Sequence, residues 1–435
     1  MKRIFALITA VVAILGLQAQ EAGGDISLLT KYEQNGAKYY DVNGKRITDM
    51  LGYFKQNGWT VMRVRLFVDP SQASSDDKGQ GVIQNLDYVK ALGARIKAAG
   101  FKLMLDFHYS DSWADPVKQF TPAAWVGQSD DELNTTIYNY TRDCLQAMVD
   151  AGATPDYIQT GNEISYGMLW GPQSASTSSL KKCYYNNDAN WSRFTSLLKN
   201  AGKACREVCP NAKIIIHTER VANTTALESI YTRINNAGVD YDVIGLSYYP
   251  YFHGYLTQLE NALNRLVSRY TKEIMIVETG YYHAYQPTNI TYDYSATYPI
   301  SNAGQDAFTQ ALVETLKKYK QVTGLVWWWP EANECGLDWS TKRVTDEWYN
   351  AGLWDNQTGR AMKAVATIGT YAGSHYAAGD VNGDGDVDIT DINCIINIIL
   401  GIEDASKYDN RADINKDSTV DVTDINAVVN TIVGN

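Results

Sequence analysis

The chain has 435 residues, enough for one large domain with a small module beside it, and 45% of them are hydrophobic, so a large core can form. Its net charge is −11, and the sequence holds no basic cluster of the kind that binds nucleic acid. Tyrosine (30 residues) and tryptophan (11 residues) are plentiful, which suits either sugar-stacking platforms or a large aromatic core.

The first residues have the features of an export signal. Lys2 and Arg3 precede an apolar run that ends at Leu17, and a small residue, Ala19, marks a plausible cleavage point. At about 14 residues the run is too short to cross a bilayer, and no other segment of the sequence is a candidate for a membrane span. We therefore predict a signal peptide at 1–19 and a protein exported to the periplasm, the cell surface or the medium.

Short apolar runs alternate with longer amphipathic segments through the region 24–371. Eight runs are expected to be strands, at 25–29, 61–68, 102–107, 157–160, 213–217, 243–248, 273–277 and 325–328. Helical periodicity lies between them, for example at 86–99, 131–151, 191–208 and 305–319. Eight strand–helix units predict a (β/α)₈ TIM barrel of the α/β class. A doubly wound sheet is the alternative, and the lack of a glycine-rich phosphate loop after the first run argues against it.

A short linker at 372–379 separates this region from an acidic tail module at 380–435. The tail holds twelve acidic and three basic residues and contains a loop repeated after 33 residues. Calcium prefers oxygen ligands at alternate loop positions, and the repeats place Asp or Asn at positions one, three, five, nine and twelve. The predicted ligands are Asp380, Asn382, Asp384, Asp388 and Asp391, and in the second copy Asp413, Asn415, Asp417, Asp421 and Asp424. With helical patterns at 392–400 and 425–433, they predict a small all-α, EF-hand-like module with structural calcium; an unliganded acidic loop is the alternative.

Two glutamates occupy the positions at which a barrel presents reactive groups. Glu163 follows the fourth predicted strand and Glu278 follows the seventh. Retaining glycosidases use two carboxyl groups roughly 5–5.5 Å apart, one as nucleophile and one as acid/base. A lone glutamate at a strand end is more often an ion-pair partner, but two at these strands favour catalysis.

Several stretches strengthen that interpretation and point to one family. They read YYD (39–41), MRVRLFVDP (62–70), DFHYSDSWADP (106–116), GNEI (161–164), LSYYP (246–250), ETGY (278–281) and WWWP (327–330). Together they resemble the endo-β-1,4-galactanase family of glycoside hydrolases, family 53 of the clan A barrels. The resemblance implies Glu163 as acid/base, Glu278 as nucleophile, and no cofactor for catalysis. Family members can carry calcium in the loop that corresponds to 281–300, but Asp293 is the only acid there, so that site is not expected.

The remaining candidates surround these two glutamates. We expect Arg65 to be the cation that keeps Glu278 ionised, and Asn162 to bind the sugar hydroxyl beside the reacting carbon. His108 is expected to donate to the substrate or to Glu163, with a histidine satisfied in the core as the alternative. Either Tyr248 or Tyr249 should hydrogen-bond the nucleophile.

Aromatic residues and one acid are further candidates for sugar contacts. Trp328 or a neighbour in the tryptophan run is expected to floor the reacting subsite, while at least one of these rings packs outward because strand residues alternate. Trp113 and Asp115, on the long loop after the third strand, are candidates for contacts with adjacent sugars.

The tail resembles a dockerin, whose partner is a cohesin on a scaffold protein. The paired positions ten and eleven, Ile389-Thr390 and Val422-Thr423, are nearly identical between the two copies, which suits two related binding modes. A calcium-stabilised spacer is the alternative. The whole chain is thus expected to hydrolyse β-1,4-galactan or arabinogalactan internally with retention. An endo-hydrolase of mannan or glucan and a non-catalytic, scaffold-attached glycan-binding protein are the alternatives.

Overall fold

The computed structural model describes most of the chain. The described residues are 20–286, 290–338, 340, 344–345, 349–373, 379–383, 387–408, 411–415 and 417–433. The predicted signal peptide, the greater part of the predicted linker and the predicted calcium ligand Asp384 lie outside them.

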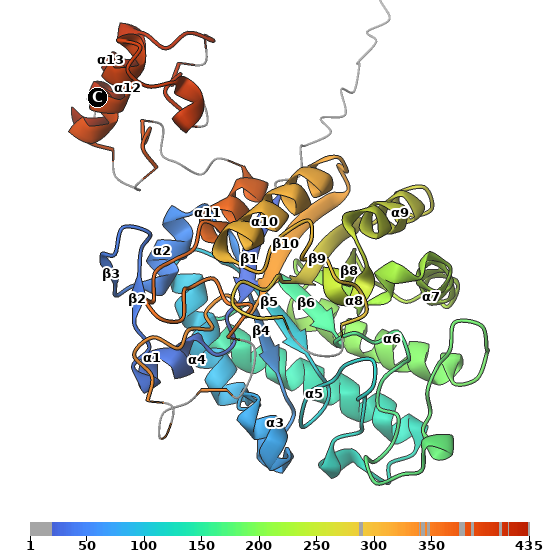
Figure 1. Ribbon diagram of the computed structural model, residues 1–435. Helices are drawn as coiled ribbons and strands as arrows, with labels where there is room; N and C mark the ends of the chain where they lie inside the picture. The colour runs from blue at the N-terminus through green and yellow to red at the C-terminus, as the bar shows by residue number, and fades with distance from the viewer. Residues whose placement is uncertain are drawn as a thin grey trace, which may run out of the picture.

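Eight parallel strands close into a barrel in the order β1-β10-β9-β8-β7-β6-β5-β4 (Figure 1). They are β1 (Glu21–Asp25), β4 (Val61–Leu66), β5 (Lys102–Phe107), β6 (Tyr157–Thr160), β7 (Lys213–Thr218), β8 (Val243–Tyr248), β9 (Glu273–Thr279) and β10 (Val322–Trp328). A separate hairpin pairs β2 (Tyr39–Tyr40) with β3 (Arg46–Ile47). The predicted TIM barrel is therefore confirmed.

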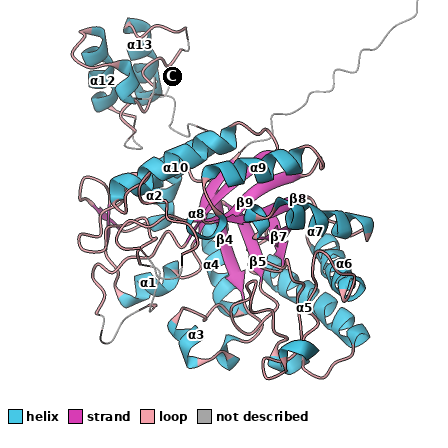
Figure 2. Ribbon diagram, turned by 45° about the vertical axis from the view of Figure 1, so that its right-hand side comes forward, coloured by secondary structure: helices cyan, strands magenta, loops and turns pink. Residues whose placement is uncertain are grey.

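Helices surround the strands, as Figure 2 shows with cyan helices outside the magenta strands. They are α1 (Leu29–Asn35), α2 (Met50–Gln56), α3 (Ser75–Gly79), α4 (Leu86–Ala98), α5 (Asp130–Asp150), α6 (Trp191–Val208), α7 (Thr224–Asn236), α8 (Pro250–His253), α9 (Leu256–Val267), α10 (Asn302–Lys317) and α11 (Ala364–Gly369). The four helices predicted by example, α4, α5, α6 and α10, agree within three residues at either end.

Local sequence explains where these elements begin and which way they face. Helix α5 begins at a capping box in which Ser129 and Glu132 each satisfy the other's backbone N–H. Along β4, Val61 belongs to a cluster inside the barrel that takes residues from six other strands, whereas Met62 and Val64 pack outward in the layer beneath the helices. Period-two alternation therefore fills the barrel interior and the outer layer from the same strand.

The first strand lies four residues earlier than predicted. It was predicted at 25–29, but β1 spans Glu21–Asp25 and α1 begins at Leu29. Gly23 and Gly24 have no side chains, so the sequence shows no apolar run at the position of this strand. Glycine is required there, because a Cβ on Gly23 would lie 1.6 Å from the carbonyl oxygen of Val61.

A β-bulge interrupts β9 just before its end. Leu246 of β8 pairs with Ile276, but the next residue, Ser247, pairs with Glu278, and the pairing with β10 shifts at the same place. Val277 packs inside the barrel, so strict alternation would turn Glu278 outward. The extra residue turns Glu278 inward as well.

The tail module contains two helices, α12 (Ile389–Ile399) and α13 (Val422–Val433), packed on a small core of Val381, Ile392, Ile395, Tyr408, Ala412 and Val428. Both helices begin three residues earlier than predicted. In α12 the side chain of Asp388 caps the helix and Asp391 completes a capping box, so the last residues of the loop form the first turn of the helix. Within the described part of the chain, no helix is long and apolar enough to cross a membrane.

Candidate active site

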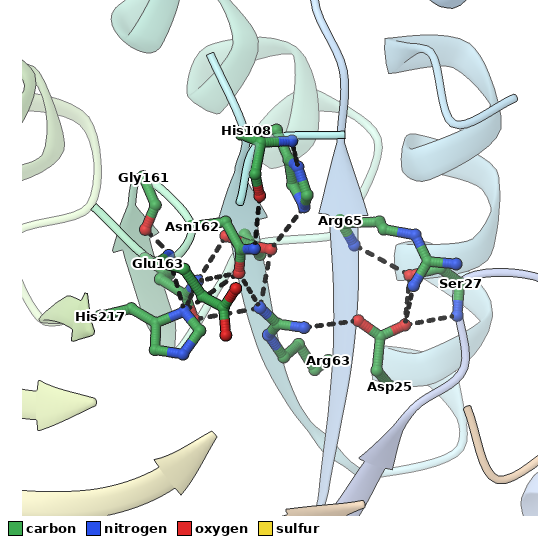
Figure 3. Close-up of polar contacts among 12 residues, drawn as sticks. Asp25, Ser27, Arg63, Arg65, His108, Gly161, Asn162, Glu163 and His217 are labelled. Atoms are coloured by element: carbon green, nitrogen blue, oxygen red, sulfur yellow. Dashed lines mark hydrogen bonds and ion pairs between the residues drawn. The ribbon is translucent and has the colours of Figure 1, made fainter. Parts of the chain in front are cut away.

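A buried arginine lies at the centre of the site. Arg63, on β4, is within 2.8 Å of Asp25 and of Asp106, and 2.9 Å from the side-chain oxygen of Asn162 (Figure 3). The same guanidinium lies 2.9 Å from Oε1 of Glu278. Burial alone would lower the pKa of Arg63, but the surrounding carboxylates raise it. Arg63 therefore stays charged and places one fixed cation against Glu278, the predicted nucleophile.

The prediction that Arg65 is this cation is wrong. Arg65 instead lies 3.1 Å from Oδ1 of Asp25, and its guanidinium lies 4.8 Å and 5.0 Å from the ring centres of Trp113 and Trp329. Both arginines face inward because they are two residues apart on one strand. The spacing in the sequence therefore could not tell which of the two pairs with Glu278. Both contact Asp25, but Arg65 packs on the indole rings and Arg63 reaches Glu278.

Glu278 is held at both carboxylate oxygens. Oε1 pairs with Arg63, and Oε2 accepts a hydrogen bond of 3.0 Å from the hydroxyl of Tyr249. Of the two tyrosines considered, Tyr249 is therefore the partner. Tyr248 packs in the outer layer and donates to the carbonyl of Gly254. Burial raises the pKa of Glu278, and the Arg63 charge and the Tyr249 hydroxyl oppose that rise.

Glu163 lies just beyond β6 in a left-handed backbone conformation, with φ of 48°, after Gly161 at φ of 109°. A non-glycine residue in this region is strained and marks a position fixed by its surroundings. Burial raises the pKa of Glu163 well above its ordinary value, and the nearby carboxyls of Glu278 and Glu219 raise it further. Because Arg63 pairs with Glu278 and not with Glu163, Glu278 ionises first and Glu163 keeps its proton.

Asn162 and His108 are both fixed by the protein. Asn162 accepts from Arg63 and donates to the carbonyl of Ala114 at 2.8 Å. The Nδ1 atom of His108 accepts from the Ala114 N–H at 3.0 Å, and its Nε2 lies 3.1 Å from Asp106. Both ring nitrogens of this buried histidine are thus engaged by protein groups, so the predicted donation to Glu163 is not found. The contacts are those of the alternative, a histidine satisfied within the protein, although its ring lines the cavity described next.

These groups open into one cavity of about 400 Å³ at the barrel mouth. It is lined by Gln80, His108, Trp113, Ala114, Asp115, Pro116, Lys118, Asn162, Glu163, Glu219, Tyr249, Phe252, His253, Glu278 and Trp328. Of the predicted contacts, Arg65 and Tyr248 do not line it. Asp115 also orders its own loop by accepting from the N–H groups of Val117 and Lys118.

The tryptophan run divides as strand alternation requires. Trp328 lines the cavity, at 6.4 Å from the ring of Tyr249 in an edge-to-face contact. Trp327 faces the outer layer, and its indole N–H donates to the carbonyl of Ala351 at 3.0 Å. One ring of the run is therefore available to a sugar, while its neighbour packs in the core.

Seven lining residues were not predicted, and two of them, Phe252 and Glu219, carry groups suited to binding or reacting with a sugar. Phe252 is 40% exposed and lies at the cavity wall, where an aromatic face can support a sugar ring. Glu219 follows directly after β7, and its Oε1 accepts from Ser165 at 2.5 Å. Burial raises the pKa of Glu219 to about 7. Glu219 follows the end of a strand as Glu163 does, so the same signal in the sequence could have identified it.

The tail loops hold their acidic side chains against their own backbone. Asp391 accepts from the N–H groups of Val381, Asn382 and Asp388, and Asp424 makes the equivalent three contacts in the second loop. Both carboxylates are fully buried. Across the described residues, no three acidic, histidine or cysteine side chains converge into a metal-binding group. The oxygen donors are nevertheless of the hard type that calcium prefers.

Comparison with known proteins covers both parts of the chain. The model of glycosyl hydrolase family 53 matches residues 21–368, and that of the dockerin type I domain matches residues 378–433. An arabinogalactan endo-beta-1,4-galactanase of Humicola insolens is 32% identical over 326 residues, which is 72% of this chain and 89% of that protein. An endo-beta-1,4-galactanase of Bacillus subtilis is 29% identical, over 77% of this chain and 81% of that protein. The solved GH53 catalytic domain of Ignisphaera aggregans has a TM-score of 0.68 and 32% identity, over 83% of this chain and 99% of that domain.

Proposed function

Because the chain belongs to glycosyl hydrolase family 53, we propose that this glycoside hydrolase is a retaining endo-β-1,4-galactanase that acts on galactan and arabinogalactan. One observation carries the mechanistic part of the proposal. Glu278 is fixed by Arg63 and Tyr249 in the same cavity as Glu163, whose pKa is raised well above its ordinary value. An ionised carboxylate beside a protonated carboxyl is the arrangement that two-step glycoside hydrolysis needs.

The reaction then runs in two displacements. Glu163 donates its proton to the glycosidic oxygen while a carboxylate oxygen of Glu278 attacks the anomeric carbon, so the glycosidic bond breaks and a glycosyl ester forms. Glu163, now ionised, takes a proton from water, which attacks the same carbon and releases Glu278. Each displacement inverts the carbon, so the product keeps the β configuration.

The surrounding residues have supporting parts in this scheme. Arg63 and Tyr249 hold the attacking carboxylate in one orientation, which removes the need to order it during reaction. Trp328 is the platform for the sugar at the cleaved bond, with His108 and Asn162 beside it. Trp113 and Asp115 are the candidates for neighbouring sugars, and Phe252 joins them.

Galactan is proposed as the substrate because relatives from Humicola insolens and Bacillus subtilis carry galactanase names. The test is product analysis on linear galactan, mannan, xylan and cellulose with the wild type and Glu278→Gln. Short oligosaccharides from galactan with the wild type alone support the substrate, the endo mode and the nucleophile. Cleavage of mannan or glucan instead would replace the substrate and keep the mechanism. Binding of galactan without any cleavage would favour the non-catalytic alternative.

For the tail we propose calcium binding and attachment of the exported enzyme to a cohesin-type scaffold. Ile389 and Val422 are 63% and 61% exposed at equivalent points of the two loops, as a duplicated contact surface requires. In each loop the buried carboxylate, Asp391 or Asp424, would be one of the ligands of a bound calcium ion. The ion would also offset the negative charge of the loop. Retention of the full chain on an immobilised cohesin, lost in chelator and restored by calcium, is the expected result. If the full chain passes the immobilised cohesin without retention both in chelator and in calcium, the tail would instead be a spacer.

A further inference from the structure

A second cavity, of about 520 Å³, opens beside the catalytic one. Its walls come from the loops that follow β4, β5 and β6, and its lining includes Gln72, Asp77, Ser110, Asp111, Phe120 and Gln173. None of these six residues lines the catalytic cavity, whereas Trp113 and Lys118 line both. The two cavities therefore share a wall.

The lining has the chemistry of a sugar site. Most of its side chains carry hydroxyl, amide or carboxylate groups, which match the hydroxyls of a sugar, and Trp113 and Phe120 supply aromatic surface for its C–H groups. Both rings are held in place. Trp113 lies under Arg65 at 4.8 Å and edge-on to Phe67 at 5.6 Å, and Phe120 packs edge-on against Trp170 at 6.2 Å. A rigid wall loses little entropy when a ligand binds.

The charges of this cavity select against an acidic sugar. Asp77, Asp111 and Lys118 are its charged residues, and Lys118 lies 3.4 Å from Asp77. Asp111 is fixed by the backbone N–H groups of Asp69 and Ala123, at 3.1 Å and 2.7 Å, and no lysine or arginine among the described residues forms an ion pair with it. A uronate placed here would face a net negative wall, so a neutral pentose or hexose fits better.

We propose that the second cavity binds a neutral glycosyl branch of the galactan chain that lies in the catalytic cavity. Trp113 and Lys118 line both cavities, so a branch that lies against them in the second cavity can stay attached to a main chain in the catalytic cavity. The inference rests on the proposed function and adds to it a separate binding site for the short neutral side chains of branched galactan. The test distinguishes this branch from a separate oligosaccharide molecule bound in the second cavity.

The test fills the second cavity and leaves the first untouched. Ala123 is exposed and lines the second cavity, while the adjacent Ala124 is also exposed and lines neither cavity, so Ala123→Trp and Ala124→Trp form a matched pair. The substrates are arabinosyl-branched galactan and the same material after enzymatic removal of its branches. Ala123→Trp is expected to lower kcat/KM on the branched form by about tenfold and to leave the debranched form unchanged; Ala124→Trp is expected to change neither. Gln173→Trp, on the loop after β6, is a second variant if Ala123→Trp does not fold.

Each other result overturns the inference or the function beneath it. Equal loss on both substrates, or no loss on either, with both folded variants overturns the branch site while galactan hydrolysis stands. Inhibition of debranched-galactan cleavage by arabinobiose in the wild type but not in Ala123→Trp would show that a separate molecule occupies the cavity. Failure of the wild type to cleave debranched galactan would instead overturn the proposed function.

Discussion

Replacing Tyr249 by phenylalanine isolates one of the two contacts that hold Glu278. The change removes the 3.0 Å hydrogen bond to Oε2 and leaves the ion pair with Arg63. A hydrogen bond to a charged group contributes about 1.5–3 kcal/mol, so kcat/KM on galactan is expected to fall by roughly 10- to 150-fold. The ring itself stays, and so do its contacts with Tyr251 and Trp328.

The pH dependence of kcat/KM should also change in Tyr249→Phe, in a direction set by the pKa of Glu278. The Tyr249 hydroxyl lowers the pKa of Glu278, so its removal raises that pKa. Activity that needs ionised Glu278 is lost as pH falls through this pKa, so the acidic limb of kcat/KM should move to higher pH in Tyr249→Phe. Tyr248→Phe is the matched control, because its hydroxyl donates to Gly254 in the outer layer. An acidic limb that stays in place in Tyr249→Phe, or that moves equally in Tyr248→Phe, would refute the reasoning.

Three further predictions follow from buried charge, packing and the tail loops. In Glu219→Gln a buried carboxyl that raises the pKa of Glu163 is lost, so the alkaline limb of kcat/KM should move to lower pH, and an unmoved limb would show that the two carboxyls act independently. Met104→Ala empties part of the packed barrel interior and should lower the free energy of unfolding by about 2–5 kcal/mol in a denaturant titration, against less than about 1 kcal/mol for the exposed Ala124→Ser. Chelation of calcium should lower the melting temperature of the tail transition in calorimetry without changing galactan hydrolysis, and a tail transition that ignores the chelator would contradict the calcium assignment.

The sequence predicted what depends on repeating patterns. Seven of the eight strands and both candidate carboxylates could be located because apolar runs recur and because strand ends carry the reactive groups. The first strand was misplaced because Gly23 and Gly24 contribute backbone and no apolar side chain. In that strand, the choice of residue is constrained by the lack of space for a side chain beside Val61 and not by hydrophobicity.

The finer geometry of the site depends on contacts between strands. Period two assigns Arg63 and Arg65 to the same face, and both contact Asp25. They differ in their other partners, because Arg63 pairs with Glu278 whereas Arg65 lies over indole rings. The inward turn of Glu278 depends on a bulge that shifts β9 against both neighbouring strands. No local pattern encodes such a shift, because it follows from how three strands pair in the closed barrel.

The central claim is that Glu278 attacks the anomeric carbon, and the configuration of the first product tests it most directly. Proton NMR of linear β-1,4-galactan during the first minutes of hydrolysis distinguishes the new reducing ends before mutarotation. The β anomer first, with the α anomer appearing only later, is the result expected of two displacements through Glu278. The α anomer first would show a single displacement by water and would contradict the assignment of Glu278 as nucleophile.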